Sequence, residues 1–146
     1  MWWLTLVLMP LLGLAIQCDP GTYIFNSTCV DCPRGWSQTA ANSNLCEECF
    51  EGNFADVVGL NECKKCPSGY FIEIEGSENC NYCPSGYFIG DEESTICFEC
   101  LPGTYQISPS SSVCDTCEPG RYSDEISTGE CKKCPIGFNQ NFAAEN

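Results

Sequence analysis

Apolar side chains in this chain come in short clusters that polar turn residues separate. Typical clusters are YFIEI at 70–74 and YFIG at 87–90, each opened by an aromatic residue and followed by a polar patch such as EGSE or EEST. Short extended runs bounded by turn residues predict a small two-stranded β-hairpin for each cluster. No stretch keeps the helical period of about 3.6 residues, and Gly or Pro interrupts every cluster, so helix is not expected.

The clusters recur at a fixed interval of 17 residues, which C-x2-C pairs mark along the chain. The pairs are Cys29/Cys32, Cys46/Cys49, Cys63/Cys66, Cys80/Cys83, Cys97/Cys100, Cys114/Cys117 and Cys131/Cys134, and a single Cys18 precedes them. The repeating unit reads C-x-x-G-x-(Y/F)-x8-C-x-x, and we number its positions 1 to 17 from the second Cys of a pair. An internal repeat of this kind indicates an array of small stacked units rather than one globular core.

Two other features accompany the cysteines. Glycine occupies position 4 in every repeat, at Gly21, Gly35, Gly52, Gly69, Gly86, Gly103, Gly120 and Gly137. An aromatic residue occupies position 6 in six of the eight repeats, at Tyr23, Phe54, Phe71, Phe88, Tyr105 and Tyr122, and stands one place earlier as Trp36 and Phe138. The glycine suits a turn that needs a positive φ. The aromatic is expected to cover its own disulfide and to pack on the next repeat, although a row of such rings could also bind glycans or another array.

We divide the chain into a signal peptide at 1–15, a shortened first repeat at 16–31, six 17-residue repeats over 32–133 and an incomplete eighth repeat at 134–146. Residues 4–14 form an apolar segment that suits a signal peptide and is too short to span a membrane, and Gly13 and Ala15 suit cleavage after Ala15. The alternative is an apolar segment of a buried core. The eighth repeat stops in mid-unit, so we expect the chain to be a fragment of a longer array.

Fifteen of the 146 residues are Cys, and the compartment decides what these cysteines do. A secreted chain enters an oxidising environment, in which its thiols pair as disulfides. In a reduced compartment, two C-x2-C pairs could instead bind Zn²⁺ through thiolates, in an all-Cys site because the chain has no histidine. The apolar N-terminal segment favours the extracellular location.

A 17-residue repeat is too small to form a core of its own, so each repeat needs a covalent cross-link. A bridge from position 1 to position 15 contributes about 3 kcal/mol through loop closure. The predicted bridges are Cys18–Cys29, Cys32–Cys46, Cys49–Cys63, Cys66–Cys80, Cys83–Cys97, Cys100–Cys114 and Cys117–Cys131. A bridge within each C-x2-C is the alternative, which would leave the hairpins without a cross-link. Cys134 is unpaired in this scheme, either because the chain is a fragment or because its thiol bonds to another molecule.

The composition is strongly acidic, with 20 Asp and Glu against 6 Lys and Arg and a net charge of −14. Such a surface disfavours nucleic acid and anionic membranes as partners. Acidic runs at 47–51, 73–78 and 91–93 could bind Ca²⁺ through oxygen ligands, but none matches an EF-hand loop. A solvated acidic face is therefore favoured, and we predict no cofactor and no metal site.

We predict neither enzymatic activity nor catalytic residues. The chain has no histidine for nucleophilic catalysis, and repeated C-x2-C pairs in turns lack the helix N-terminus that activates a redox thiol. The sequon Asn26-Ser27-Thr28 makes Asn26 the predicted N-glycosylation site.

Stretches such as CPSGYF, followed by CFEC and PGTY, resemble the ephrin-receptor-like cysteine-rich repeat. They are also similar to the single-disulfide module of tumour-necrosis-factor-receptor repeats. The resemblance covers residues 18–146. It implies tandem, elongated arrays in an extracellular protein, which act as spacers and interaction modules with protein or glycan partners at the cell surface.

The sequence therefore predicts a small disulfide-rich repeat protein, in which short β-hairpins and turns stack into an elongated rod and each repeat touches only its neighbours. The leading function is that of a secreted or cell-surface structural spacer, as part of a matrix, coat or filament. The alternative is a ligand-binding ectodomain of a receptor-like protein, and end-to-end self-association is a third hypothesis. A ligand-binding surface is expected where a repeat breaks the pattern, as the shortened first repeat and the repeat with Trp36 do.

Overall fold

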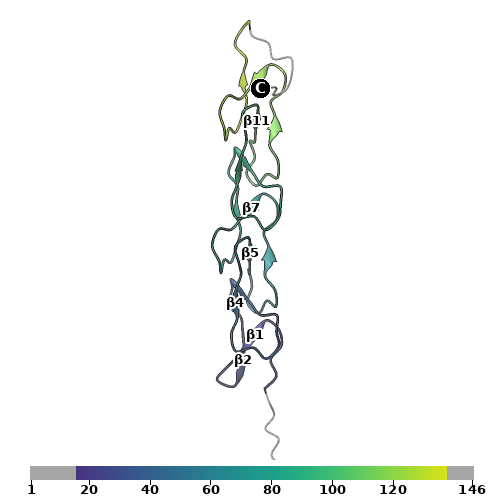
Figure 1. Cartoon of the computed structure of the whole chain (residues 1–146), viewed down its shortest axis with the longest axis vertical. Helices are drawn as coiled ribbons and strands as arrows, with labels where there is room; N and C mark the ends of the chain where they lie inside the picture. The colour runs from purple at the N-terminus through teal and green to yellow at the C-terminus, as the bar shows by residue number, and fades with distance from the viewer. Residues whose placement is uncertain (1–15, 138–146) are drawn as a thin grey trace, which may run out of the picture.

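The computed structural model describes residues 16–137, which form a long, narrow rod (Figure 1). Within this range the backbone forms two-stranded antiparallel hairpins, one in each of repeats 1 to 7, and no helix. The predicted fold class, a disulfide-rich array of short hairpins stacked into a rod, is confirmed. The predicted signal peptide and the end of the eighth repeat, from residue 138, lie outside the described residues.

Each hairpin pairs positions 5 and 6 of its repeat with positions 17 and 16, as Tyr70 and Phe71 pair with Tyr82 and Asn81. The strands are β1 (Thr22–Phe25), β2 (Thr28–Asp31), β3 (Trp36–Ser37), β4 (Glu47–Glu48), β5 (Asn53–Phe54), β6 (Lys64–Lys65), β7 (Tyr70–Phe71), β8 (Asn81–Tyr82), β9 (Tyr87–Phe88), β10 (Phe98–Glu99), β11 (Thr104–Tyr105), β12 (Asp115–Thr116), β13 (Arg121–Tyr122) and β14 (Lys132–Lys133). In repeats 2 to 6 the first strand is half-buried and the second is exposed. Each hairpin therefore lays its aromatic strand against the rod.

Repeat 1 has a longer hairpin than the others. Strands β1 and β2 pair over four residues, and the two residues between them, Asn26 and Ser27, have positive φ values of 47° and 60°. Two positive-φ residues in a two-residue loop are typical of a type I′ turn, which matches the twist of antiparallel strands. This tight turn replaces the longer loop of the other repeats, so Cys18 and Cys29 are 11 residues apart rather than 14.

Disulfides close all seven hairpins of the described chain. Each joins position 1 to position 15 in repeats 2 to 7, and Cys18 to Cys29 in the shortened repeat 1. The structure brings together the cysteines expected to pair: Cys18–Cys29, Cys32–Cys46, Cys49–Cys63, Cys66–Cys80, Cys83–Cys97, Cys100–Cys114 and Cys117–Cys131. The bonded Cα atoms are 5.4 to 5.8 Å apart, within the usual range. Because a two-stranded hairpin is marginally stable in water, each bridge holds a unit that could not persist alone.

Backbone hydrogen bonds join each repeat to the next, and the same pattern recurs at every junction from repeat 1 to repeat 7. Between repeats 4 and 5, the Gly69 amide donates to the Ile89 carbonyl at 2.9 Å, and the Ile72 amide donates to the Ser94 carbonyl at 3.1 Å. A further bond runs back from the amide of position 11 to the carbonyl of position 1. Because these bonds join main-chain groups, the same stacking pattern recurs in repeats whose side chains differ at most other positions.

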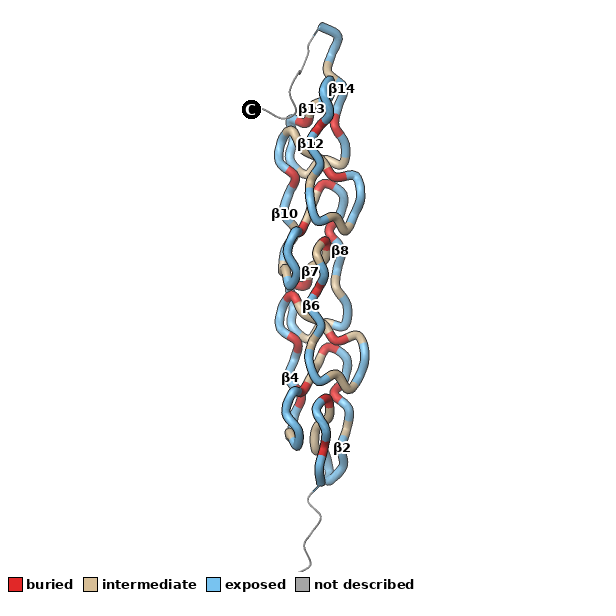
Figure 2. Tube along the Cα trace, turned by 90° about the vertical axis from the view of Figure 1, so that its right-hand side faces the viewer, coloured by how far each residue is buried: buried red, intermediate tan, exposed pale blue. Residues whose placement is uncertain are grey.

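Each repeat also contacts the repeat two places further on, which corrects the expectation that repeats touch only immediate neighbours. Position 11 has a positive φ in repeats 2 to 7, and the carbonyl there covers a position-4 glycine two repeats earlier. A Cβ atom on Gly69 would overlap the Ser110 carbonyl oxygen, and one on Gly86 would overlap the Ser127 carbonyl oxygen. The loops line up in columns along the rod, so loops two repeats apart stack on each other (Figure 2).

Buried residues recur in short segments along the whole length of the rod (Figure 2). This core consists mainly of the position-1 cysteines and of position 7, which is occupied by Gln38, Ala55, Ile72, Ile89, Gln106 and Ser123, each at most 6% exposed. Cys46 and Cys131 at position 15 and several position-4 glycines are buried as well. Position 7 makes main-chain hydrogen bonds on both sides, so its side chain is held between repeats. The aromatic residues at position 6, which were expected to provide the main packing, are only half-buried.

Polar residues at position 7 keep their hydrogen bonds inside the rod. The Gln106 side chain donates to the Val113 carbonyl at 2.7 Å and accepts from the Ser108 amide at 3.0 Å. Gln38 binds the loop of its own repeat in the same way, through Leu45 and Ala40. A buried amide without partners would cost about 1–3 kcal/mol, so these bonds allow glutamine to replace isoleucine in the core.

Candidate interaction surface

The aromatic side chains at position 6 line grooves between successive repeats. Such grooves lie at the junctions of repeats 1 and 2, 5 and 6, and 6 and 7, with volumes of about 240, 670 and 270 Å³. Each contains the aromatic of one repeat, Tyr23, Phe88 or Tyr105, together with positions 2, 5, 14 and 15 of the next repeat. The aromatic rings thus pack on one side and are accessible on the other, so their packing role leaves a surface on which a partner could bind.

The grooves share this construction but differ in chemistry. The groove between repeats 6 and 7 is the more polar, because Glu118, Arg121 and Glu130 line it together with Tyr105 and Ile107. The groove between repeats 1 and 2 is flanked by Trp36 and Leu45. The side chains at positions 2, 5 and 14 of one repeat, together with lining residues of the repeat before it, therefore determine what each groove can bind, while the backbone determines where the groove lies.

The groove between repeats 5 and 6 is the largest of these and is mainly apolar. Phe98, Leu101 and Val113 line it and are 52%, 65% and 57% exposed. The rings of Phe88 and Phe98 face each other across strands β9 and β10, with centroids 6.0 Å apart. A binding surface was expected in the first repeat and in the repeat with Trp36, and not at this junction. The available signal was Phe98, which stands where repeats 2, 3, 4, 6 and 7 have a charged or amide side chain.

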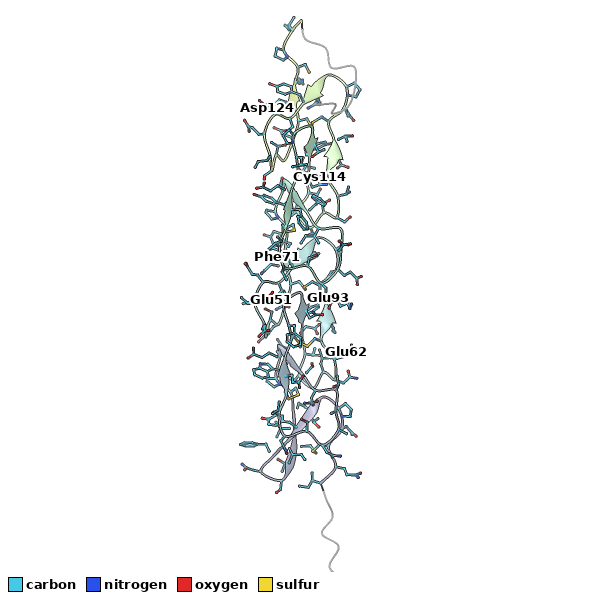
Figure 3. All side chains as sticks on the ribbon, in the orientation of Figure 1. Glu51, Glu62, Phe71, Glu93, Cys114 and Asp124 are labelled. Carbon is cyan, nitrogen blue, oxygen red and sulfur yellow. A yellow bond between two sulfur atoms is a disulfide. The ribbon has the colours of Figure 1, made fainter. Side chains whose placement is uncertain are left out.

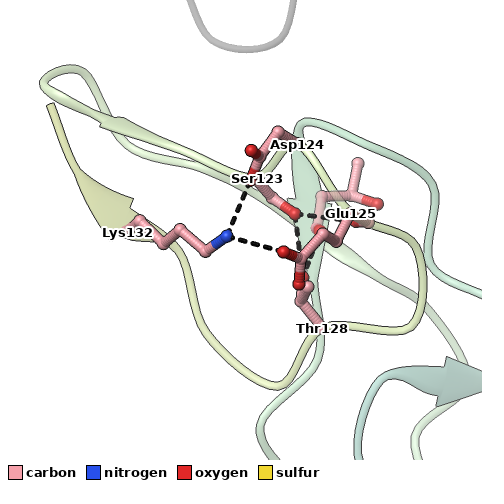
Figure 4. Close-up of polar contacts among 6 residues, drawn as sticks. Ser123, Asp124, Glu125, Thr128 and Lys132 are labelled. Carbon is pink, nitrogen blue, oxygen red and sulfur yellow. Dashed lines mark hydrogen bonds and ion pairs between the residues drawn. The ribbon is translucent and has the colours of Figure 1, made fainter.

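Ion pairs within a repeat join position 16 to position 8. Lys132 lies 2.9 Å from a carboxylate oxygen of Asp124 and 2.9 Å from one of Glu125 (Figure 4). Lys64 and Asp56 form the equivalent pair in repeat 3 at 2.7 Å. The hydrogen bond from the lysine lowers the pKa of Asp56 and that of Asp124. These exposed pairs tie the loop of a repeat to its second strand.

Glu93 forms a different kind of contact, because its partners come from a repeat two places earlier. One oxygen of Glu93 accepts a hydrogen bond from Lys65 at 2.7 Å and the other accepts one from Asn53 at 3.1 Å. These bonds lower the pKa of Glu93 and raise that of Lys65. The contact adds side-chain bonds to the main-chain stacking of repeats 3 and 5.

Other acidic side chains, such as Glu51 and Glu62, project from the rod into solvent (Figure 3). Over residues 16–137, no three side chains of Cys, Asp or Glu gather closely enough to hold a metal ion. The acidic runs at 47–51, 73–78 and 91–93 lie in different repeats along the rod. Their main effect is a negative field along its length.

The predicted glycosylation site and the unpaired cysteine lie near opposite ends of the described chain. Asn26 is exposed at the tip of the β1–β2 turn, where the Thr28 hydroxyl of the same sequon donates to the Phe25 carbonyl at 2.7 Å. Cys134 forms no disulfide within the described residues and is half-buried. The first position is open to a glycan and the second carries a thiol.

Comparison with known families supports the resemblance seen in the sequence. Residues 37–79 and 52–95 match the model of a family described as tyrosine-protein kinase ephrin type A/B receptor-like. The two overlapping matches are offset by about one repeat, as expected for a tandem array, and they confirm the resemblance over this part of the chain. None of the curated proteins compared with the chain matches it.

Ephrin-receptor-like repeats and regularly spaced disulfides point to an extracellular disulfide-rich domain. Such a repeat is a structural or binding module and does not belong to a known class of enzyme. Within residues 16–137 there is no helix long and apolar enough to cross a membrane.

Proposed function

We propose that this chain is a secreted or cell-surface spacer, a stiff rod that holds other parts of an extracellular matrix, coat or filament apart. The observation that carries this proposal is the contact between repeats two places apart. In it, a position-4 glycine lies against the position-11 carbonyl of the repeat two places further on. Bending the rod at one junction would move those two groups apart or drive them into each other. The array therefore resists bending more than a chain of repeats with nearest-neighbour contacts alone.

The acidic surface supports the same role. With a net charge of −14, parallel rods repel one another, so they stay separate unless a specific contact joins them. Protein or glycan partners at the cell surface would bind along the side of the rod, where the grooves lie.

Small-angle X-ray scattering of deletion variants tests the spacer function. Removing residues 66–82 deletes one whole repeat, and removing 66–99 deletes two, and both leave every remaining disulfide pair intact. The maximum dimension should fall by equal steps while the cross-sectional radius stays constant. Unequal steps, or a wild-type chain that scatters as a flexible string, would contradict a stiff spacer.

A ligand-binding ectodomain is the second candidate function, and the accessible apolar groove between repeats 5 and 6 favours it. The two functions differ in what a groove substitution changes. For a spacer, the substitution alters neither shape nor assembly, whereas for a ligand-binding ectodomain it removes binding and leaves the shape unchanged.

We further propose that the chain is secreted after cleavage behind Ala15, that Asn26 carries a glycan and that Cys134 keeps a free thiol. Mass spectrometry of the secreted chain, alkylated without reduction, tests all of these together. The expected result is a chain that starts at Ile16, one alkylated thiol, and an added mass that an N-glycosidase removes. Alkylation of most cysteines together with bound zinc would overturn the extracellular assignment.

A further inference from the structure

The groove between repeats 5 and 6 has an apolar lining that the fold does not require. Position 16 is Phe98 here, but it is Glu47, Lys64, Asn81, Asp115 and Lys132 in repeats 2, 3, 4, 6 and 7. Position 2 is Leu101 here, whereas several other repeats have proline. The same hairpin and the same disulfide form with all of these residues, so stability of the repeat does not explain Phe98 and Leu101.

These side chains remain largely in water although they could be polar without harm to the hairpin. Phe98 is 52% exposed, Leu101 is 65% exposed and Val113 is 57% exposed, and all three line one groove of about 670 Å³. Adjacent exposed apolar side chains around a hollow are typical of a binding site. The groove is large enough to take a bulky side chain of a partner between Phe98 and Val113.

The charge around the groove indicates which partner fits. No Lys or Arg occurs between Lys65 and Arg121, and this stretch carries nine acidic residues. One of them, Glu99, lies in the wall of the groove itself. A second copy of this chain would bring a similar negative surface and be repelled, whereas a basic segment would be attracted to it.

We propose that this groove binds a basic protein segment, which inserts a large apolar side chain between Phe98, Leu101 and Val113 and places lysine or arginine next to Glu99. The apolar contact supplies most of the affinity, because the inserted side chain and the groove leave water together. The charges orient the segment and speed its association. The site lies on the side of the rod, so it operates without disturbing the stacking of repeats.

Peptides that vary apolar and charged residues separately test this proposal. The full secreted chain, labelled with ¹⁵N, is titrated with the peptides KKFLKK, EEFLEE and KKSSKK at low salt. KKFLKK should bind at least about tenfold more tightly than either of the others and should shift the amides of Phe98, Leu101 and Val113. Raising the salt concentration should weaken its binding. Equal binding of EEFLEE would overturn the basic partner, and equal binding of KKSSKK would overturn the apolar insertion.

Substitutions taken from the other repeats supply variants that keep the fold. Phe98→Asn copies repeat 4, and Leu101→Pro copies repeats 2, 4 and 5, so the double variant should keep all disulfides and only one alkylatable thiol. It should bind KKFLKK at least about tenfold more weakly than the wild type. Phe50→Pro is the matched control, because Phe50 is 71% exposed at the same position of repeat 3 and lies outside this groove. Unchanged binding of KKFLKK by the double variant would overturn the site. A wild-type chain that is a dimer, and that the double variant converts to a monomer, would instead show that a second copy of the chain occupies the groove.

Discussion

Gly69 in the middle of the array and Gly120 near its C-terminal end have the same place in the repeat and nearly the same φ, 84° and 83°. Their surroundings differ. Gly69 is buried beneath the Ser110 carbonyl, whereas Gly120 is exposed, and none of the described residues lies within 4 Å of the place where its Cβ would be. The comparison separates two requirements for glycine. The turn needs a positive φ in every repeat, and the stack needs a missing side chain where another repeat covers it.

Contacts between repeats two places apart also distinguish this rod from an array in which each repeat touches only its immediate neighbours. Repeat 4 meets repeat 6 at Gly69, and it meets repeat 2 through the contact of Gly35 with Gly76. A repeat in the middle is therefore held from one and two places away on both sides, while the last described repeats have fewer such contacts. We expect local stability to be highest in repeats that are held in this way from both sides.

Alanine at each of these two glycines should give the largest effect. Both substitutions force a non-glycine residue into a positive φ, which costs about 1–2 kcal/mol. Gly69→Ala also pushes its Cβ into the Ser110 carbonyl, and overpacking of this kind adds about 1–3 kcal/mol. Gly69→Ala should therefore destabilise the rod clearly more than Gly120→Ala. Hydrogen exchange of individual amides measures both, because it reports the stability of each junction separately.

The location of the lost protection provides the control. Gly69→Ala should expose the Ile89 and Ser110 amides, which both bond across the junction of repeats 5 and 6, and should leave the amides of repeat 2 protected. Gly120→Ala should affect only its own hairpin. Equal losses at the two positions would mean that the contact over two repeats adds nothing to stability.

Truncation of the core at position 7 should have the next largest effect. Ile72 is 1% exposed, and Ile72→Ala should cost about 2–3 kcal/mol, toward the lower end for a buried isoleucine because a narrow rod closes over the cavity. In repeat 7 the same position is Ser123, whose hydroxyl bonds to Glu125 and Thr128, so Ser123→Ala should cost only about 1 kcal/mol. Denaturant unfolding followed by circular dichroism measures the two differences.

Ile74→Ala is the matched control for Ile72→Ala, because Ile74 lies in the same loop and is 67% exposed. It should change stability by less than about 0.5 kcal/mol. A loss as large as that of Ile72→Ala would mean that burial at position 7 is not what holds the repeats together.

Much of the fold could be predicted because its determinants are local and repeated. The 17-residue period, Gly at position 4 and the cysteines at positions 1 and 15 indicated hairpins closed by one bridge each. The contact over two repeats could not be read in the same way. Its other half, position 11, is Asn42, Gly59, Gly76, Glu93, Ser110 and Ser127, and only its backbone conformation is constant.

The core and the groove escaped prediction for related reasons. Position 7 carries Gln, Ala, Ile or Ser, so its burial follows from main-chain bonds on both sides and not from its hydrophobicity. The groove between repeats 5 and 6 depends on Phe98 and Leu101, which belong to neighbouring repeats and come together only when the repeats stack. Comparing each position across repeats, and not only the most regular ones, would have singled out Phe98.

The smallest expected effect is that of removing an ion pair. Two pairs can be compared, Lys65 with Glu93 between repeats 3 and 5 and Lys132 with Asp124 within repeat 7. Lys65 and Asn53 hold the pKa of Glu93 below the ordinary value of 4.5, so this carboxylate favours the folded rod above that pH. The contribution of Glu93 to the stability of the folded rod is lost as the pH falls through the lowered pKa that this carboxyl has in the folded state. Carbon-13 NMR of the carboxyl groups should show that Lys65→Gln raises the pKa of Glu93 toward its ordinary value and leaves that of Asp124 lowered.

Lys132→Gln is the matched control, since it removes the partner of Asp124 within repeat 7 and should raise the pKa of that carboxyl while leaving the pKa of Glu93 lowered. The two variants should also differ in the hydrogen exchange of their backbone amides. Loss of the Lys65 contact should loosen amides in both repeat 3 and repeat 5, because Glu93 joins them, whereas loss of Lys132 should loosen repeat 7 alone. If Lys65→Gln raised the pKa of Glu93 without any change in hydrogen exchange, this side-chain contact would add nothing to stability, and the main-chain contact between Gly52 and the Glu93 carbonyl would hold repeats 3 and 5 without it.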